Sequence, residues 1–176
     1  YTTTPLCCPA RASIFSGRYA HNHGVRANHL SHELDQTSTI QHHLQGAGYR
    51  TAIAGKFLNQ WGTEEPPAYF DRWAIFLQGE YYDRQWNIDG EVDRLPDYTN
   101  DVVRDKALEF LRDFDRSADD EPWFLYVGTN AAHAPFTPEP KYSDALPGAI
   151  EADPAMRERD ISDKPELIRT SRSSPP

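Results

Sequence analysis

Apolar residues recur with helical spacing in two places, and each time a short apolar run follows. Residues 38–48 (STIQHHLQGAG) open on a serine that can cap a helix, carry Ile40 and Leu44 four positions apart, and end on a glycine. Residues 49–55 (YRTAIAG) are then predicted to form a strand, and Lys56 stands where that strand ends. The first part of the chain therefore predicts a helix followed by a strand.

The same order returns in the second half of the chain. Thr99 can cap a helix over residues 100–114, and a buried strand is predicted at residues 123–127 (WFLYV). The loop that follows, residues 129–135 (TNAAHAP), contains His133. The helix carries one apolar stripe, made of Val103, Ala107, Phe110, Leu111 and Phe114.

Helix followed by strand, twice, indicates an α/β domain with a largely parallel sheet flanked by helices. In such sheets ligands bind outside the carboxyl ends of the strands, where Lys56 and His133 are both expected. Residues 81–95 are predicted to form a hairpin around the turn pair Asp89 and Gly90. The hairpin either lines a pocket or decorates the sheet, and decoration is the interpretation we favour.

The stretch CCPARASIFSGR near the start holds both cysteines of the chain and predicts a short helix. Pro9 suits the first position of a helix and Gly17 the position just after its end, so the helix is expected over residues 9–16. Cys7 would then lie at its mouth, facing unpaired backbone N–H groups, with Arg11 in the first turn. Such surroundings favour a thiolate and can hold a tetrahedral anion such as sulfate or phosphate.

The composition narrows the class of protein. The 176 residues include 18 Lys and Arg against 27 Asp and Glu, a net charge of −9, and their mean hydropathy is −0.74. We expect no nucleic-acid partner, because phosphate contacts need a basic face. We also expect no transmembrane segment, because no apolar run is long enough to span a bilayer. No signal peptide is visible, but the chain starts at Tyr1 rather than Met, which indicates a piece of a longer protein.

Two histidines follow the cysteines and raise the alternative of a zinc site. His21 and His23, with Cys7 and Cys8, would supply four ligands of the right kind. Adjacent cysteines chelate one tetrahedral ion poorly, however, because structural zinc sites separate their cysteines by two or more residues. Zinc is therefore the less favoured interpretation.

The order Cys7-x-Pro9-x-Arg11, followed by SGR at residues 16–18, resembles the signature of the type I sulfatases. In that family the cysteine is oxidised after translation to formylglycine. The form CCPxRAS, with HNH at residues 21–23, is most similar to the branch that contains N-acetylglucosamine-6-sulfatases. The resemblance implies an alkaline-phosphatase-like sulfatase fold.

Two segments further along fit the same family. Residues 54–59 (AGKFLN) resemble its Gly-Lys segment, which implies that Lys56 contacts the substrate sulfate. The HAP segment resembles its His-x-Pro segment, which implies that His133 binds or protonates the leaving-group oxygen. Many sulfatases have histidine at the position of Leu58. The Lys-x-Leu-Asn form found here is similar to the glucosamine-6-sulfatase branch, and it makes Asn59 a candidate to bind the substrate.

The resemblance also implies a mechanism. One hydroxyl of hydrated formylglycine, derived from Cys7 and bound to Ca²⁺, attacks the sulfur of a sulfate ester, and collapse of the second hydroxyl to the aldehyde releases the sulfate. Arg11 and Lys56 offset the negative charge, Arg11 also holds the hydrate, and His133 supplies a proton to the leaving alcohol. Cys8 is expected only to pack.

The family is only partly present in this chain. Residues 1–165 are expected to be a partial catalytic domain that lacks the first metal-binding strand and the C-terminal metal site. Residues 166–176 are expected to be a mobile tail or a severed continuation. The other Ca²⁺ ligands would lie outside the chain, so we expect the parent protein to be a sulfatase and the isolated chain to be inactive.

The implied partners are a sulfated carbohydrate of the amino-sugar glycan type, or another sulfate ester, and the formylglycine-generating enzyme. The resemblance implies a secreted, periplasmic or lysosomal protein. Two alternatives stay open. One is a phosphonate or phosphate monoester hydrolase of the same superfamily, and the other is a non-enzymatic α/β fragment whose cysteine is never modified.

Overall fold

The computed structural model describes residues 3–62, 64–76, 79–116, 120–145 and 158–171. Contacts divide the chain into two compact units, Tyr1–Thr137 and Pro138–Pro176. The predicted boundary at residue 165 stays a prediction. All the strands described below belong to the first unit, and no helix among the described residues is long and apolar enough to cross a membrane.

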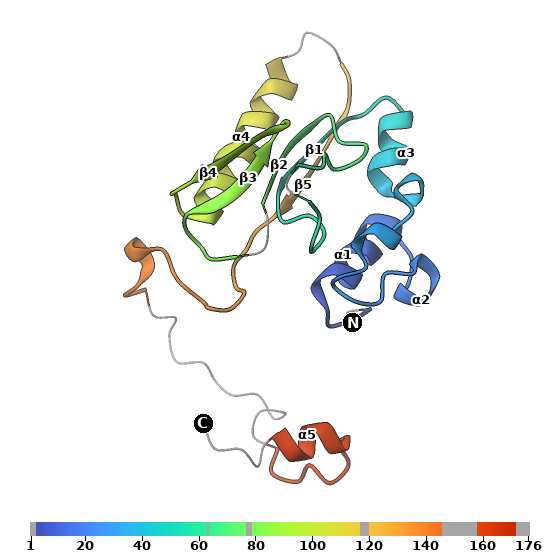
Figure 1. Cartoon of the computed structure of the whole chain (residues 1–176), viewed down its shortest axis with the longest axis vertical. Coiled ribbons are helices and arrows are strands. Elements are labelled where there is room, and N and C mark those ends of the chain that lie inside the picture. The colour runs from blue at the N-terminus through green and yellow to red at the C-terminus, as the bar shows by residue number, and fades with distance from the viewer. Residues whose placement is uncertain (1–2, 63, 77–78, 117–119, 146–157, 172–176) are drawn as a thin grey trace. The chain divides into compact units, whose positions relative to one another are not determined.

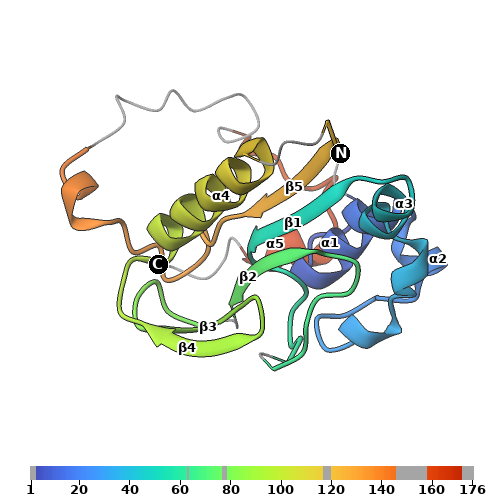
Figure 2. The same ribbon diagram turned by 90° about the horizontal axis from the view of Figure 1, so that it is seen from above.

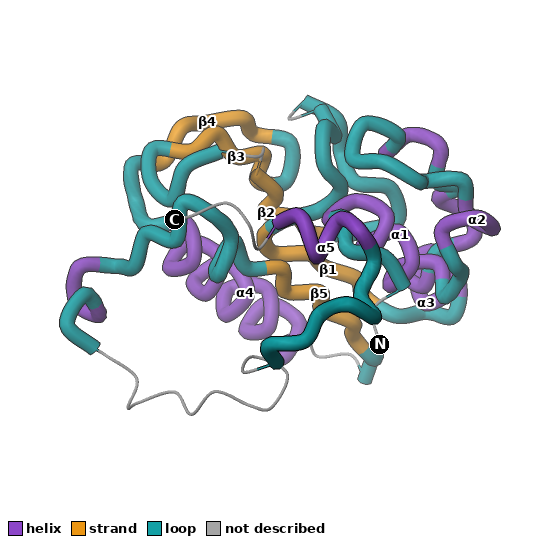
Figure 3. The backbone as a smooth tube through the Cα atoms, turned by 90° about the horizontal axis from the view of Figure 1, so that it is seen from below, coloured by secondary structure: helices purple, strands orange, loops and turns teal. Residues whose placement is uncertain are grey.

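The first unit is built on a five-stranded sheet with the order β4-β3-β2-β1-β5 (Figure 1). β1 is parallel to both of its neighbours, β2 and β5, whereas β3 pairs antiparallel with β2 and with β4. The predicted α/β class is confirmed, and the sheet is mixed because the hairpin adds two antiparallel strands (Figure 3). The strands are β1 (Arg50–Gly55), β2 (Arg72–Phe76), β3 (Arg84–Ile88), β4 (Glu91–Leu95) and β5 (Trp123–Gly128).

Helices flank this sheet on both faces. α4 covers one face, and α1 and α3 lie on the other side (Figure 2). Short 3₁₀ turns at Ser31–Glu33 and Gln36–Ser38 join α2 to α3. The helices of this unit are α1 (Cys7–Ser16), α2 (Ala20–His23), α3 (Ile40–Gly46) and α4 (Thr99–Arg116).

Alternation along the strands separates two hydrophobic layers. On the α4 face, Ala52 and Ala54 of β1 pack against large side chains of the helix such as Phe110, so small sheet residues let the helix approach closely. On the opposite face, Ile53 lies in a cluster with Phe15 of α1. The apolar stripe predicted for α4 is confirmed, with Leu111 only partly buried.

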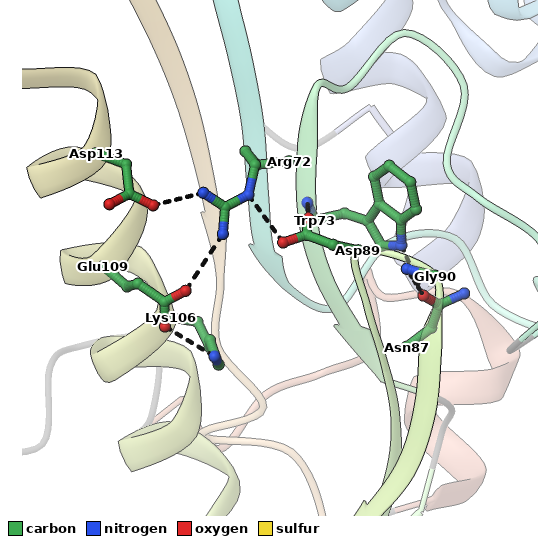
Figure 4. A network of polar contacts seen from close by, with 8 residues as sticks. All are labelled: Arg72, Trp73, Asn87, Asp89, Gly90, Lys106, Glu109 and Asp113. Carbon is green, nitrogen blue, oxygen red and sulfur yellow. Dashed lines mark hydrogen bonds and ion pairs between the residues drawn. The ribbon is translucent and has the colours of Figure 1, made fainter. Parts of the chain in front are cut away.

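Arg72, at the start of β2, ties three elements together (Figure 4). Its guanidinium donates hydrogen bonds to Asp89 in the hairpin turn and to Glu109 and Asp113 on α4. The guanidinium carbon also lies 4.7 Å from the centroid of the Phe110 ring. The two carboxylates on α4 are four residues apart and therefore share one face of the helix. We call Arg72, Asp89, Glu109 and Asp113 the Arg72 cluster.

The hairpin turn forms as predicted. Asp89 and Gly90 both adopt positive φ, 49° and 98°, which is the backbone geometry of a tight two-residue turn. β5, by contrast, is less buried than expected: Trp123 is 50% exposed and Val127 48% exposed. The reason is the position of β5 at the end of the strand order, beyond β1.

Helix starts differ from the predictions by a few residues. α1 begins at Cys7, so Pro9 occupies its third position and not its first, while Gly17 ends the helix at φ 66° as expected. α3 begins at Ile40, two residues after the predicted cap Ser38, which lies in a 3₁₀ turn.

Two side chains at helix starts also behave differently from the predictions. Ile40 is 40% exposed, although the spacing placed it on the buried face. Thr99 lies inside α4, and its hydroxyl donates to the carbonyl of Tyr81 instead of capping the helix.

The second unit holds little regular structure among its described residues. Pro140–Tyr142 form a 3₁₀ turn and Glu166–Ser171 form the short helix α5. α5 thus occupies the beginning of the segment predicted as a tail, and residues 172–176 lie outside the described part.

Candidate active site

The two faces of α1 separate the adjacent cysteines. Cys7 and Arg11 are four residues apart on the face that lines a pocket, whereas Cys8 and Phe15 are seven apart on the face that is buried in the core. Cys8 is fully buried, so the prediction that it packs is confirmed. Cys7 is partly exposed.

The pocket has a volume of about 370 Å³ and lies at the carboxyl ends of β1 and β5. It brings together four of the five predicted site residues, from α1, from the end of β1 and from the loop after β5. Asn59 is the fifth, and it is absent from the lining. The lining residues are Cys7, Ala10, Arg11, Ile14, Lys56, Tyr126 and Thr129 to His133.

Arg11 is fixed by contacts to both neighbouring strands. Its Nη1 donates to the backbone oxygen of Lys56 and to the hydroxyl of Tyr126, each at 2.9 Å. The Tyr126 ring packs against Phe15 with centroids 4.8 Å apart, which anchors the hydroxyl. Because the helix begins at Cys7, Arg11 lies in its second turn and not in the first turn as predicted.

Two glycines allow the chain to bring Lys56 into the pocket. Gly55, at φ 110°, ends β1, and a Cβ there would lie 2.0 Å from the backbone oxygen of Gly128. A Cβ on Gly128 would lie 2.7 Å from the oxygen of Lys56 and 3.2 Å from Nη1 of Arg11. The close approach lets the Lys56 N–H donate to the Gly128 oxygen at 2.8 Å. Any larger side chain at these positions would displace the two cations.

Lys56 is a buried cation, with 6% of its surface exposed. Burial lowers the pKa of its ammonium group, and the positive charges of Arg11 and Arg84 lower it further, while a side-chain hydrogen bond with Cys7 and the charge of that sulfur act in the opposite direction. An anion in the pocket would relieve this cost, because it stabilises the charged ammonium. The site is therefore electrostatically prepared for an anion.

His133 lies on the loop after β5 and is exposed. Its Nδ1 lies 2.8 Å from the carbonyl oxygen of Ala134, and a carbonyl can only accept a hydrogen bond. Nδ1 therefore carries a proton, which leaves Nε2 as the atom that can give or take a proton. The loop is held by Asn130, whose carbonyl accepts the His133 N–H at 3.0 Å.

Other residues singled out in the sequence lie deeper. Asn59 is buried beside Cys8, whose sulfur accepts a hydrogen bond from the Asn59 backbone N–H. Its predicted contact with substrate stays a prediction. Leu58 is a member of the hydrophobic core next to α1, so it contributes packing at a position where many sulfatases have histidine.

His23 is also part of the structural framework. Its Nδ1 accepts the N–H of Val25 at 3.1 Å, and its Nε2 lies 3.0 Å from the hydroxyl of Ser13 on α1. Both ring nitrogens are thus occupied by protein partners, which leaves none for a zinc ion.

Three further residues around the pocket belong to no motif in the sequence. Tyr126 belongs to the apolar strand predicted at residues 123–127, and its hydroxyl accepts a hydrogen bond from Arg11. Asn130 and Arg84 were not predicted as site residues. Asn130 lines the pocket, and Nη1 of Arg84 donates a hydrogen bond to Oδ1 of Asn130. Tyr126 could have been found by alternation: it lies two residues before Gly128 and therefore on the same face of β5.

A calcium site is not complete in the described residues. No three His, Cys, Asp or Glu side chains within them lie close enough to hold a metal ion. Ca²⁺ usually takes six to eight oxygen ligands, and a modified Cys7 would supply only a small part of that set. The residues present therefore do not fit a calcium ion by themselves.

Residues 1–158 match the family model for sulfatases. The chain belongs to the sulfatase family. The match covers the pocket and every predicted site residue. The resemblance found in the CCPAR, GK and HAP segments is thus confirmed at the level of the family.

The sulfatase chain is similar to curated and structurally solved relatives. It is 33% identical over 167 residues to the N-acetylglucosamine-6-sulfatase of Homo sapiens, covering 83% of this chain and 30% of that protein. It is 34% identical over 158 residues to the extracellular sulfatase SULF-1 homolog of Drosophila melanogaster, covering 81% of this chain and 14% of that protein.

A solved structure supports the fold. The structure of BT4656 in complex with D-glucosamine-2-N,6-O-disulfate matches with a TM-score of 0.72 and 30% identity, covering 88% of this chain and 31% of that one. The predicted sulfatase fold is therefore confirmed, as a partial domain. The chain spans less than a third of the length of each of these relatives.

Proposed function

We propose that the parent protein is a sulfatase that hydrolyses sulfate esters of amino-sugar glycans, and that this chain supplies its nucleophile and its sulfate-binding cations. The observation that carries the proposal is the pocket in which Cys7, Arg11, Lys56 and His133 meet from three separate segments. The names of the human relative and of the solved complex support an amino-sugar substrate.

Cys7 is the proposed precursor of the nucleophile. Its oxidation to formylglycine supplies a hydrated aldehyde, one hydroxyl of which attacks the sulfur while the other allows the sulfate to be expelled. Cys7 lines the pocket and Cys8 is fully buried in the core, which supports the first cysteine as the reacting one.

Arg11 and Lys56 are proposed to bind the sulfate. Arg11 is held by Lys56 and Tyr126 and so presents a guanidinium in a fixed orientation, which suits a tetrahedral oxyanion. Lys56 brings a buried ammonium group to the same pocket. Their combined charge would stabilise the negative charge that accumulates on the sulfuryl oxygens in the transition state.

His133 is proposed to protonate the leaving alcohol through Nε2. Its Nδ1 lies 2.8 Å from the Ala134 carbonyl oxygen and donates to it, which leaves Nε2 as the nitrogen that can transfer a proton. The divalent metal is proposed to be Ca²⁺, with ligands that come mainly from outside the described residues. We also propose that the formylglycine-generating enzyme acts on Cys7 and that the protein is exported, as the extracellular relative's name supports.

The proposed activity is tested with the parent protein coexpressed with a formylglycine-generating enzyme. We expect kcat/KM for glucosamine-6-sulfate to exceed that for glucosamine-6-phosphate, and Cys7→Ala to lower turnover by roughly 10⁴-fold or more. A preference for the phosphate ester would favour the phosphate or phosphonate hydrolase alternative. No turnover of either ester by fully converted protein would contradict the proposal.

A further inference from the structure

His133 is exposed, so its orientation depends on what holds its loop. One contact comes from the segment that leads into the hairpin. The hydroxyl of Tyr81 donates to the backbone oxygen of His133 at 2.7 Å. Tyr81 itself is buried, whereas a surface insertion without a role in the site would expose most of its side chains.

Tyr81 is rigidly anchored on the side away from the loop. Its ring stacks on Tyr98, with centroids 5.6 Å apart and an interplanar angle of 15°. Its backbone oxygen accepts the N–H of Thr99 at 2.7 Å and the Thr99 hydroxyl at 2.8 Å, at the start of α4. The Tyr81 hydroxyl therefore projects from a fixed base toward the loop.

Arg84 provides a second, independent contact. Its Nη1 lies 3.4 Å from Oδ1 of Asn130, and the carbonyl of Asn130 accepts the His133 N–H. Arg84 is 4% exposed, donates to the backbone oxygens of Gly79 and Glu80, and lies 4.3 Å from the centroid of the Phe76 ring.

A buried guanidinium normally has a carboxylate partner, because an unpaired buried charge is costly. In the described part of the chain no carboxylate lies within ion-pair distance of Arg84. Its side chain instead binds Asn130, which is itself almost fully buried and is fixed from the other side by Asn100, whose Oδ1 accepts the Asn130 N–H at 3.0 Å. Tyr81 and Arg84 thus hold the loop by two hydrogen bonds, one at residue 133 and one at residue 130.

We propose that Tyr81 and Arg84 are positioning residues that aim Nε2 of His133 at the leaving-group oxygen, so that the hairpin is a working part of the site. This inference rests on the proposed function. As the bond between sulfur and the bridging oxygen breaks, its electron pair stays on that oxygen, which takes the Nε2 proton. His133 is left neutral and regains its proton from solvent. A displaced loop would weaken this transfer and leave sulfate binding by Arg11 and Lys56 unchanged.

The dependence on the leaving group tests the proposal. An amino-sugar sulfate releases a basic alkoxide that needs a proton, whereas p-nitrophenyl sulfate releases a stable phenolate that does not. We expect Tyr81→Phe to lower kcat/KM roughly 10-fold for glucosamine-6-sulfate and less than about 2-fold for p-nitrophenyl sulfate. Arg84→Lys, which keeps the charge but loses the fork geometry, should show the same pattern.

The adjacent residue provides the matched control. Tyr82→Phe removes a hydroxyl from a ring that also packs against Tyr98, and it should change neither rate. Equal losses for both substrates in Tyr81→Phe would indicate a merely structural role and overturn the proposal. No loss for either substrate would overturn it as well.

A second measurement does not depend on catalysis. Amide hydrogen exchange should be faster in residues 129–136 of Tyr81→Phe than in the wild-type chain, with the rest of the first unit unchanged. Unchanged exchange in this loop would contradict the positioning role even if the parent protein hydrolyses sulfate esters. Faster exchange without any sulfatase activity would confirm that Tyr81 holds the loop and would refute only the proposed function.

Discussion

The cation of the Arg72 cluster, beside α4, and the two cations of the pocket, at the carboxyl ends of β1 and β5, have opposite kinds of partners. In the Arg72 cluster a guanidinium meets three carboxylates, from the hairpin turn and from α4. At the pocket, Arg11 and Lys56 have carbonyl, hydroxyl and thiol partners, and within the described residues no carboxylate lies at ion-pair distance from either. The charge of Arg72 is neutralised by carboxylates of the protein. The charges of Arg11 and Lys56 are left, in the proposed function, for an incoming sulfate.

The comparison explains how an acidic chain can still present a pocket that suits an anion. The net charge is −9, yet none of the carboxylates in the described part of the chain lines the pocket. Because screening confines surface charges to about 8 Å at physiological salt, the local cations decide what binds there. The burial of Lys56 is thus a cost that the proposed binding of sulfate would offset.

Among the cation replacements, the replacement of a pocket cation has the largest expected effect. Lys56→Met removes a charge that would contact the sulfate, so turnover should fall by roughly 10²–10³-fold, equivalent to about 3–4 kcal/mol. The free energy of unfolding should stay the same or rise, because burial lowers the pKa of this ammonium and so opposes its charged form.

The matched control for that variant is Lys106→Met. Lys106 is on α4 and pairs with Glu109, at the edge of the Arg72 cluster. Turnover should stay within about 2-fold of wild type, since the residue is not part of the pocket. Equal losses of turnover in the two variants would refute the distinction between pocket and structural cations.

Breaking the structural cluster should have the converse effect. Arg72→Met leaves three carboxylates without their common partner and should lower the free energy of unfolding by about 2 kcal/mol. Turnover per folded molecule should not change. Denaturant unfolding together with active-site titration measures the two quantities separately, and a loss of turnover at unchanged stability would contradict the assignment.

His23, whose ring contacts Ser13 of α1, should have a smaller effect on stability, and this effect should depend on pH. Burial lowers the pKa of its imidazole below the ordinary value near 6.5, so the unfolded chain takes up the proton at a higher pH than the folded chain. Stability should therefore be retained above pH 6.5 and decline as the pH falls below it. In His23→Gln this part of the pH dependence should disappear, as unfolding curves between pH 5 and pH 8 would reveal; an identical decline in both proteins would contradict it.

Much of the fold followed from local pattern. The helix at α4, the strands β1 and β5 and the turn at Asp89 and Gly90 each carry their own signal of periodicity or turn chemistry. β2 was not predicted, because its RWAIF sequence is short and lies between loops without a distinctive alternation. The exposure of β5 depends on strand order, which no single segment encodes.

The candidate site was predictable where a residue belongs to a motif. Cys7, Arg11, Lys56 and His133 were all named from short segments, and the fold brings them into one pocket. Tyr81, Arg84 and Tyr126 were missed, because their importance comes from contacts with residues more than 40 positions away. Such tertiary contacts leave no local trace in the sequence, apart from the alternation that gives the face of β5 on which Tyr126 lies.

The central claim is that the two adjacent thiols have different fates because α1 turns one to the pocket and the other to the core. Mass spectrometry of the peptide that contains both cysteines, after coexpression of the parent protein with a formylglycine-generating enzyme, tests it most directly. We predict conversion of Cys7 to formylglycine with Cys8 left as a thiol. An unmodified Cys7, under conditions that fully convert a known substrate of that enzyme, would contradict the account.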